Sequence, residues 1–258
     1  MGLDLYAGTL SRYYSRGWET IAQRELGAVL IFPDGEPSYP PFSEVHELVE
    51  LWVSDLQAKI ANSGGSLRNW DELENTPYYS DKPDFEGYWS LIIWAAYLSK
   101  PTDTRPRSFC SMEELLANQV YQAAKAQPTS LVTILESELF VPDERAFVFQ
   151  AQNLAGNEVY ISTTAALRHA LEKVNLGSWN GSTADLDSWR RSGLPAISET
   201  QIKEYRPFGF LPKRKKFLTR QIPEAVDKLQ QAAQYAFSIY WTALEFAEMH
   251  RVPIVLDM

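Results

Sequence analysis

Apolar and polar residues alternate over positions 3–9, which is the pattern of a β-strand with one buried face. Apolar residues at mixed helical spacing then predict a helix over about 17–26, which Gly27 ends. A short strand is expected at 28–32, and the turn residues of 33–41 predict a loop. The N-terminal part of the chain therefore mixes strand and helix.

Two helices with different surroundings are expected next. An apolar stripe with a period of 3.6 residues predicts a helix over 43–62 with one buried face. The polar stretch 66–83 has no clear period, and we interpret it as an ordered loop because aromatic residues are rare in disordered linkers. The segment 84–99 is apolar all round, with Asp84 as the expected cap, and this pattern predicts a helix in the core.

The middle of the chain is expected to contain a helix, three strands and a second helix. A capping box that begins at Ser111 predicts one helix running to about Ala126. A cap at Thr163 or Thr164 predicts another that ends near Gly177. Between these helices we expect strands at 139–141, 146–152 and 158–162, the last two paired as a hairpin around Gly156.

Residues 176–222 form the most irregular part of the sequence, with glycine and proline residues throughout. The apolar residues of 224–250 predict a long and largely buried helix. A buried strand is expected at 252–256, although Pro253 favours a strand start or an edge position. We expect this strand to lie beside the strand at 3–9.

Together these elements predict one α+β domain over residues 1–258, in which several helices pack on a central mixed β-sheet. A long C-terminal helix followed by a short strand completes it. The composition agrees with this class, since 45% of the residues are hydrophobic and 22% are charged. The aromatic content of 13% argues against a disordered chain.

The charge is acidic overall and unevenly distributed. The chain carries 24 Lys and Arg residues against 33 Asp and Glu residues, a net charge of -9. Seven cations and one anion give the segment 203–220 a charge of +6, so the rest sums to -15. Aromatic residues within this segment would suit nucleic-acid contact, but a solvated hairpin is the favoured interpretation because the acidic remainder repels polyanions. Its candidate anion contacts are Lys213, Arg214, Lys215 and Lys216.

Sequence motifs exclude several classes of enzyme. The chain lacks GxxxxGK[ST], GxGxxG and GxSxG, which disfavours P-loop enzymes, kinases, Rossmann dehydrogenases and α/β-hydrolases. His46 and Glu50 would share a helix face as in HExxH, yet no third ligand is apparent. No metal and no cofactor are therefore expected. Cys110 is the single cysteine of the chain, so no intramolecular disulfide can form.

We expect a cytoplasmic protein with no membrane partner. The N-terminal residues do not resemble a secretory signal. The longest apolar run, 89–98, is about half the length that crosses a bilayer.

A set of aromatic and acidic residues is the candidate binding surface. Tyrosine and tryptophan contribute much of the energy at protein interfaces, and carboxylates beside them suit a basic partner. Packing in the core would explain the same residues equally well. The candidate residues are Asp4, Tyr6, Tyr13, Tyr14, Trp18, Trp70, Tyr78, Tyr79 and Asp81.

The two ends of the chain carry a resemblance. Residues 1–14 read MGLDLYAGTLSRYY and residues 250–257 read HRVPIVLD, which is similar to a group of uncharacterised bacterial cytosolic proteins. This resemblance implies no activity and no catalytic residue. Small acidic proteins of this kind are often immunity partners of secreted toxins, an association by character alone.

Three functions stay open at this point. We expect a non-enzymatic, protein-binding role of the immunity or antitoxin type, in which an acidic Tyr- and Trp-rich surface occludes a basic toxin. The alternative is an enzyme of unrecognised class with a carboxylate and tyrosine pocket around Asp4, Tyr6, Tyr13 and Asp81. A weaker alternative is nucleic-acid contact through 203–220.

Overall fold

The structure is a computed structural model that describes most of the chain. The strand expected at 28–32, the capping residue Ser111, Cys110 and Lys213 lie outside the described residues. The described ranges are 3–27, 39–62, 67, 70–101, 103–108, 112–195, 198–205, 214–221 and 227–257.

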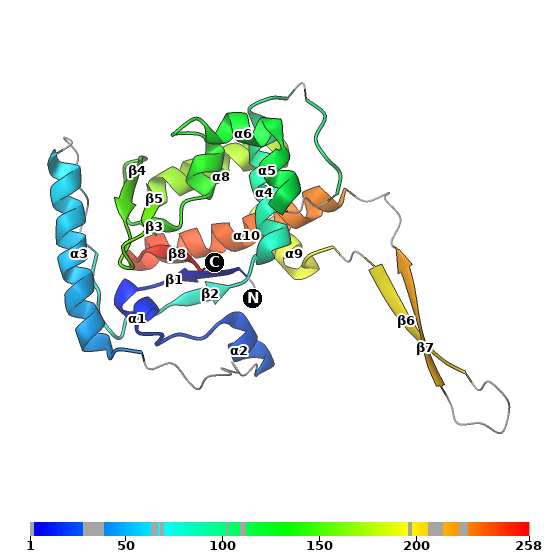
Figure 1. The fold of residues 1–258 in the computed structure, drawn as a ribbon, viewed down its shortest axis with the longest axis horizontal. Helices are drawn as coiled ribbons and strands as arrows, with labels where there is room; N and C mark the ends of the chain where they lie inside the picture. The colour runs from blue at the N-terminus through cyan, green and yellow to red at the C-terminus, as the bar shows by residue number, and fades with distance from the viewer. Residues whose placement is uncertain are drawn as a thin grey trace.

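A six-stranded mixed β-sheet forms the centre of the molecule, with strand order β2-β1-β8-β3-β5-β4 (Figure 1). All neighbours are antiparallel except β3 and β5, which run parallel. Helices cover this sheet, so the predicted α+β fold is confirmed. The strands are β1 (Asp4–Ala7), β2 (Tyr79–Asp81), β3 (Leu139–Val141), β4 (Val148–Gln152), β5 (Glu158–Thr163) and β8 (Ile254–Asp257).

The two ends of the described chain meet in the sheet. Strand β1 pairs with β8 in an antiparallel register that places Leu5 opposite Leu256. Tyr6 lies opposite Val255 in the same pair. This arrangement confirms that the first and last strands are neighbours, and it places β8 inside the sheet between β1 and β3.

Ten helices surround the sheet in the described part of the chain. Figure 1 shows α4, α8 and α10 together, with α3 on the other side of the strands. The helices are α1 (Leu10–Tyr14), α2 (Ile21–Leu26), α3 (Phe42–Asn62), α4 (Asp84–Leu98), α5 (Met112–Ala117), α6 (Gln119–Lys125), α7 (Leu131–Leu135), α8 (Thr164–Ser178), α9 (Thr183–Ser192) and α10 (Lys228–His250).

The sheet separates two hydrophobic clusters, because alternate residues of a strand point to opposite faces. Leu5 and Leu256 belong to the larger cluster, which α4, α8 and α10 complete. Tyr6 and Val255 belong to the smaller one, which α1 and α3 complete. Each terminal strand therefore contributes to both sides of the core.

Helices α4 and α10 form the most extensive helix–helix contact in the described part of the chain. A Cβ atom built on Gly87 of α4 would lie 3.3 Å from the Cβ of Ala236 and 3.3 Å from Leu194. Small residues at this crossing let the two helices approach each other. The predicted long buried helix is confirmed, but it begins at Lys228 because Asp227 caps it by accepting from the Gln230 amide at 2.9 Å.

Local hydrogen bonds explain where the predicted helices are wrong. The expected helix to Ala126 is broken at Asn118, whose side chain accepts from the Tyr121 amide at 3.0 Å and starts α6. Asp84 is not a cap, since Pro83 occupies that position and Asp84 pairs with Lys82 at 3.2 Å. The expected loop 66–83 ends in β2, which pairs with β1.

Short helices also replace segments for which we expected a different structure. The predicted helix over 17–26 begins only at Ile21, where Thr20 and Gln23 form a capping box. Ser130 and Ser182 cap α7 and α9, which the sequence analysis missed. These helices are too short to show a clear hydrophobic period, so side-chain caps define them.

The segment 176–222 also contains a two-stranded antiparallel ribbon. Strand β6 (Ser198–Tyr205) pairs with β7 (Arg214–Gln221) in a sheet of its own. Figure 1 shows this ribbon extending away from the six-stranded sheet. Most of the basic segment lies on these strands, with Arg214, Lys215 and Lys216 on β7.

We predict that Gly87→Val lowers the free energy of unfolding by about 2 kcal/mol, because the added methyl groups would separate α4 from α10. Urea denaturation of purified protein measures this change. Glu86→Val places the same side chain at the neighbouring exposed position and controls for the helix propensity of valine. Equal stability of the two variants would contradict close packing at this crossing.

Candidate functional site

The N-terminal aromatic residues of the candidate set do come together, but in the core. The ring of Tyr6 lies 5.4 Å from that of Tyr13 and 5.0 Å from that of Trp18, between centroids. Tyr6 is fully buried, and Tyr13 and Trp18 are 9% and 8% exposed. Tyr78 stacks on Tyr6 at 5.9 Å. These rings pack beneath α3, so core packing accounts for them.

Trp70 is buried as well, and its partner is a carboxylate that the sequence analysis missed. The Trp70 indole donates to Glu72 at 2.6 Å. Glu72 also accepts from the amides of Leu10 at 3.1 Å and Ser11 at 2.8 Å, and so fixes the first turn of α1. No local pattern marks Glu72, because these amides lie 62 and 61 positions away in sequence.

Of the two acidic candidates, Asp81 is neutralised by neighbouring groups. Asp81 is buried, accepts from the Tyr79 hydroxyl at 2.8 Å and forms an ion pair with Arg190. Asp257, which was not among the candidates, accepts from the Tyr13 hydroxyl at 2.6 Å and pairs with Arg16 at 3.2 Å. These carboxylates hold the structure together rather than present free negative charge.

Five of the nine candidates are therefore buried, and the predicted Tyr- and Trp-rich surface shrinks to its partly exposed members. The alternative carboxylate and tyrosine pocket is brought together only in part, since Asp4 and Tyr6 share one face of β1 and Tyr13 packs on Tyr6. Asp81 lies opposite Leu5 in the β1–β2 pair and shares its face, whereas Tyr6 points to the other face. The partly exposed candidates are Asp4, Tyr14, Tyr78 and Tyr79.

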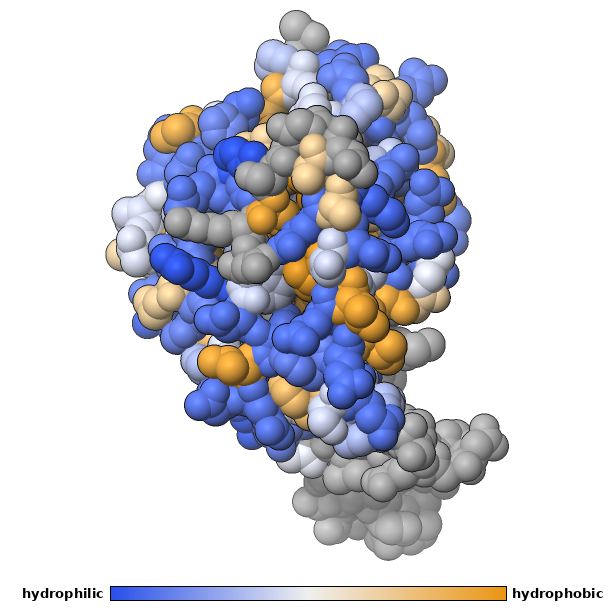
Figure 2. Space-filling model, turned by 90° about the vertical axis from the view of Figure 1, so that its left-hand side faces the viewer, coloured by the Kyte–Doolittle hydropathy of each residue, from blue (hydrophilic) through white to orange (hydrophobic). Residues whose placement is uncertain are grey.

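The outer side of α3 carries a surface that the sequence analysis did not single out. The helix buries Val49 and Leu56 against the smaller cluster, while Leu48 and Leu51 are 58% and 68% exposed. Figure 2 views the molecule from this side and shows hydrophobic patches within a largely hydrophilic surface. We call this surface the α3 face and define it by the exposed residues Glu44, Glu47, Leu48, Glu50, Leu51 and Asp55.

His46 and Glu50 do share a face of α3, as the spacing predicted, with 3.2 Å between Nε2 and Oε1. The other ring nitrogen, Nδ1, lies 3.4 Å from the hydroxyl of Ser11. Within the described ranges, no three histidine, cysteine or acidic side chains are arranged to hold a metal ion.

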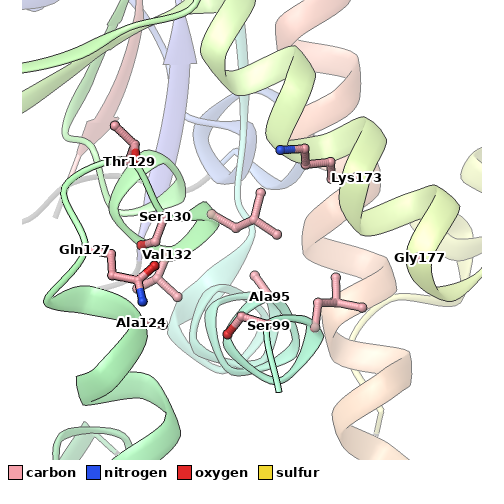
Figure 3. Close-up of a pocket in the computed structure, with 11 residues that line it drawn as sticks. Ala95, Ser99, Ala124, Gln127, Thr129, Ser130, Val132, Lys173 and Gly177 are labelled. Atoms are coloured by element: carbon pink, nitrogen blue, oxygen red, sulfur yellow. The ribbon is translucent and has the colours of Figure 1, made fainter. Parts of the chain in front are cut away.

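Several hollows open on the surface, and their polar groups mostly satisfy one another. The hollow in Figure 3, about 360 Å³, is lined by α4, the α6–α7 turn and α8. Its Ser99 hydroxyl donates to the Ala96 carbonyl at 2.6 Å, and its Ser130 hydroxyl caps α7. A larger hollow at the end of β3 contains Arg168, which is paired with Glu248.

We predict that Asp4 makes stability fall as the pH rises from about 4 to about 6. Burial raises the pKa of the Asp4 carboxyl from 3.8 to about 6, and the nearby ammonium of Lys82 lowers it only in part. The native state therefore holds a proton that the unfolded chain releases, so the stabilisation is present below pH 3.8 and lost as the pH passes about 6.

Asp4→Asn should raise the free energy of unfolding at pH 7 by about 1 kcal/mol, a value reduced for the partial solvent exposure of Asp4. It should also flatten the dependence between pH 4 and pH 6. Urea titrations across this range measure both effects, with the exposed Asp71→Asn as control. A variant less stable than the parent at pH 7 would refute this role for Asp4.

Comparison with known proteins adds no relative: no known family, curated protein or solved structure matches this chain. The resemblance at the two ends of the chain stays a prediction. In the part of the chain that the structure describes, no helix combines the length and the apolar character needed to cross a membrane.

Proposed function

We propose that this protein binds a basic protein partner through the α3 face, in a non-enzymatic role of the immunity or antitoxin type. One observation carries the proposal: Leu48 and Leu51 are 58% and 68% exposed in the middle of a strongly acidic helix face. An exposed apolar pair at this spacing has no role in the fold, whereas an apolar centre with a charged rim is the usual anatomy of an interface.

The charges of the α3 face select the chemistry of the partner. Glu44, Glu47, Glu50 and Asp55 are all exposed around the two leucines. The chain outside 203–220 also sums to -15, so the long-range field favours a cationic protein and repels nucleic acid. Such a field raises the association rate and guides the orientation of the partner.

The α3 face is preformed, which reduces the entropy cost of binding. Val49 is fully buried and Leu56 is 2% exposed on the inner side of the helix. The Trp52 indole donates to the carbonyl oxygen of Gln152 at 2.7 Å and ties α3 to β4. A rigid helix can then present both leucines at a fixed spacing to a complementary groove.

In this role the protein acts by occlusion. Burying a leucine side chain at an interface contributes about 1.5–3 kcal/mol, so the two leucines supply specific affinity. The carboxylates around them pair with cations on the partner. If these cations are the groups with which a toxin contacts its target, the complex inactivates it without chemistry.

The partner can be captured with a photo-crosslinking residue at Leu51 of the full chain in its native host. Leu176 on α8, which is 70% exposed, is the matched control position. We expect a basic protein to cross-link at position 51 and not at position 176. An identical set of cross-linked proteins at both positions would refute a specific α3 face.

The purified partner then tests affinity and role. We predict that Leu48→Ser with Leu51→Ser weakens binding about a hundredfold, whereas Leu176→Ser leaves it unchanged. Glu47→Gln with Glu50→Gln should slow association, most clearly at low salt. Co-expression of the parent protein, but not the Leu48 and Leu51 variant, should rescue cells from the partner. A partner that does not inhibit growth would overturn the immunity role.

A further inference from the structure

A hollow of about 310 Å³ lies between α4, α5, α6 and the β4–β5 hairpin, and it shares no residue with the α3 face. We call it the Tyr88 hollow. Tyr88 and Trp89 of α4 form one wall, and Tyr160 of β5 contributes to another. Met112 and Leu116 of α5 line it and are 53% and 48% exposed, so its apolar rim reaches solvent. This volume is at the lower end of the range for small-molecule sites.

A network of hydrogen-bonded and charged side chains forms one side of the Tyr88 hollow. The hydroxyl of Tyr121 donates to Oε1 of Glu136 at 2.6 Å and accepts from Nζ of Lys125 at 2.9 Å. Lys125 also pairs with Oε2 of Glu136 at 3.1 Å. The three groups fix one another, and Tyr121 is 1% exposed, so this wall is rigid and already satisfied.

Other polar groups at the same place have no partner. Among the described residues, no hydrogen bond or ion pair reaches the hydroxyl of Tyr88 or the carboxylate of Glu138, which both line the hollow. Tyr88 is 6% exposed. Behind it, the hydroxyl of Tyr240 is fully buried and also unpaired within the described part of the chain. Buried polar groups are nearly always paired in folded proteins, so the Tyr240 hydroxyl lacks an expected partner, whereas the unpaired groups of Tyr88 and Glu138 line an open hollow.

The pKa shifts of Tyr88 and Glu138 reflect their burial and, for Tyr88, the acidic groups close to it. Burial raises the pKa of the Tyr88 hydroxyl, and Tyr240, Glu136, Tyr121 and Glu138 lie near enough to raise it further. Burial also raises the pKa of the Glu138 carboxyl. A cation placed between these groups would offset the desolvation of Glu138 and favour its charged form.

The charged side chains that line the hollow favour a positively charged ligand. Glu136, Glu138 and Glu158 face one cation, Lys125, which leaves an excess of negative charge. Aromatic side chains also line the hollow, and the face of an aromatic ring attracts cations. An anionic ligand would meet three carboxylates, and a purely apolar one would leave Glu138 unpaired.

We propose that the Tyr88 hollow binds a small organic cation, an amine or quaternary ammonium compound with an apolar body. The cationic group pairs with Glu138 and lies against the aromatic walls, while Tyr88 donates or accepts one further hydrogen bond. The apolar body contacts Met112 and Leu116 at the rim. This site is independent of the proposed partner and involves no chemical step.

Calorimetric titration of the full chain tests the proposal with three cations of different shape: phenethylamine, spermidine and tetramethylammonium. The neutral 2-phenylethanol and the anionic phenylacetate have nearly the same apolar body as phenethylamine and control for its contribution. We expect at least one cation to bind with a Kd below about 1 mM, and the neutral and anionic analogues to bind at least tenfold more weakly.

Conservative variants test whether the cation binds in the Tyr88 hollow. Glu138→Gln should weaken the cation about tenfold or more, because it removes a charged partner. Tyr88→Phe should weaken it about fivefold. Glu74→Gln, at an exposed position outside the hollow and the α3 face, should have no effect, and thermal melting of each variant verifies that it is folded. Binding unaffected by Glu138→Gln, equal binding of 2-phenylethanol, or no binding of any of the three cations would overturn the proposal.

Discussion

The pairing of β1 with β8 is the contact on which the rest of the structure depends. Strand β8 lies between β1 and β3, so without it the sheet would separate into a β2–β1 pair and a β3–β5–β4 unit. The same strand pair contributes residues to both hydrophobic clusters, since Leu5 faces α4 and α10 while Tyr6 faces α3. The bond from Tyr13 to Asp257 adds a side-chain link between the two ends.

The hydrophobic pattern predicted the long elements because each one buries a regular stripe or run of residues. Helix α3 begins one residue before the predicted 43–62, and α4 closely follows the predicted 84–99. Short elements such as α7 depend on a single serine cap, which many loops also contain. Strand β2 has three residues, too few to display a period.

The candidate site was harder to predict, because composition does not say which side of a strand or helix faces solvent. Tyr6 and Trp70 have the residue types of an interface and yet lie in the core. Leu48 belongs to the predicted apolar stripe, but the helix turns it outward together with Leu51. Residues such as Glu72 and Glu138 acquire their meaning from partners, or from the lack of them, that are distant in sequence and appear only in three dimensions.

The central position of β8 also has a consequence for how the chain reaches its native state on the ribosome. The bond between Tyr13 and Asp257 spans 244 positions, and the strand pair around it is equally non-local. Strand β1 emerges first but finds this neighbour only after residue 257 has left the exit tunnel. Until then the edges of β1 and β3 that pair with β8 have no strand beside them. Such unpaired edges promote association between nascent chains. The large sequence separation of β1 and β8 therefore lengthens the time for which the β1 edge stays unpaired.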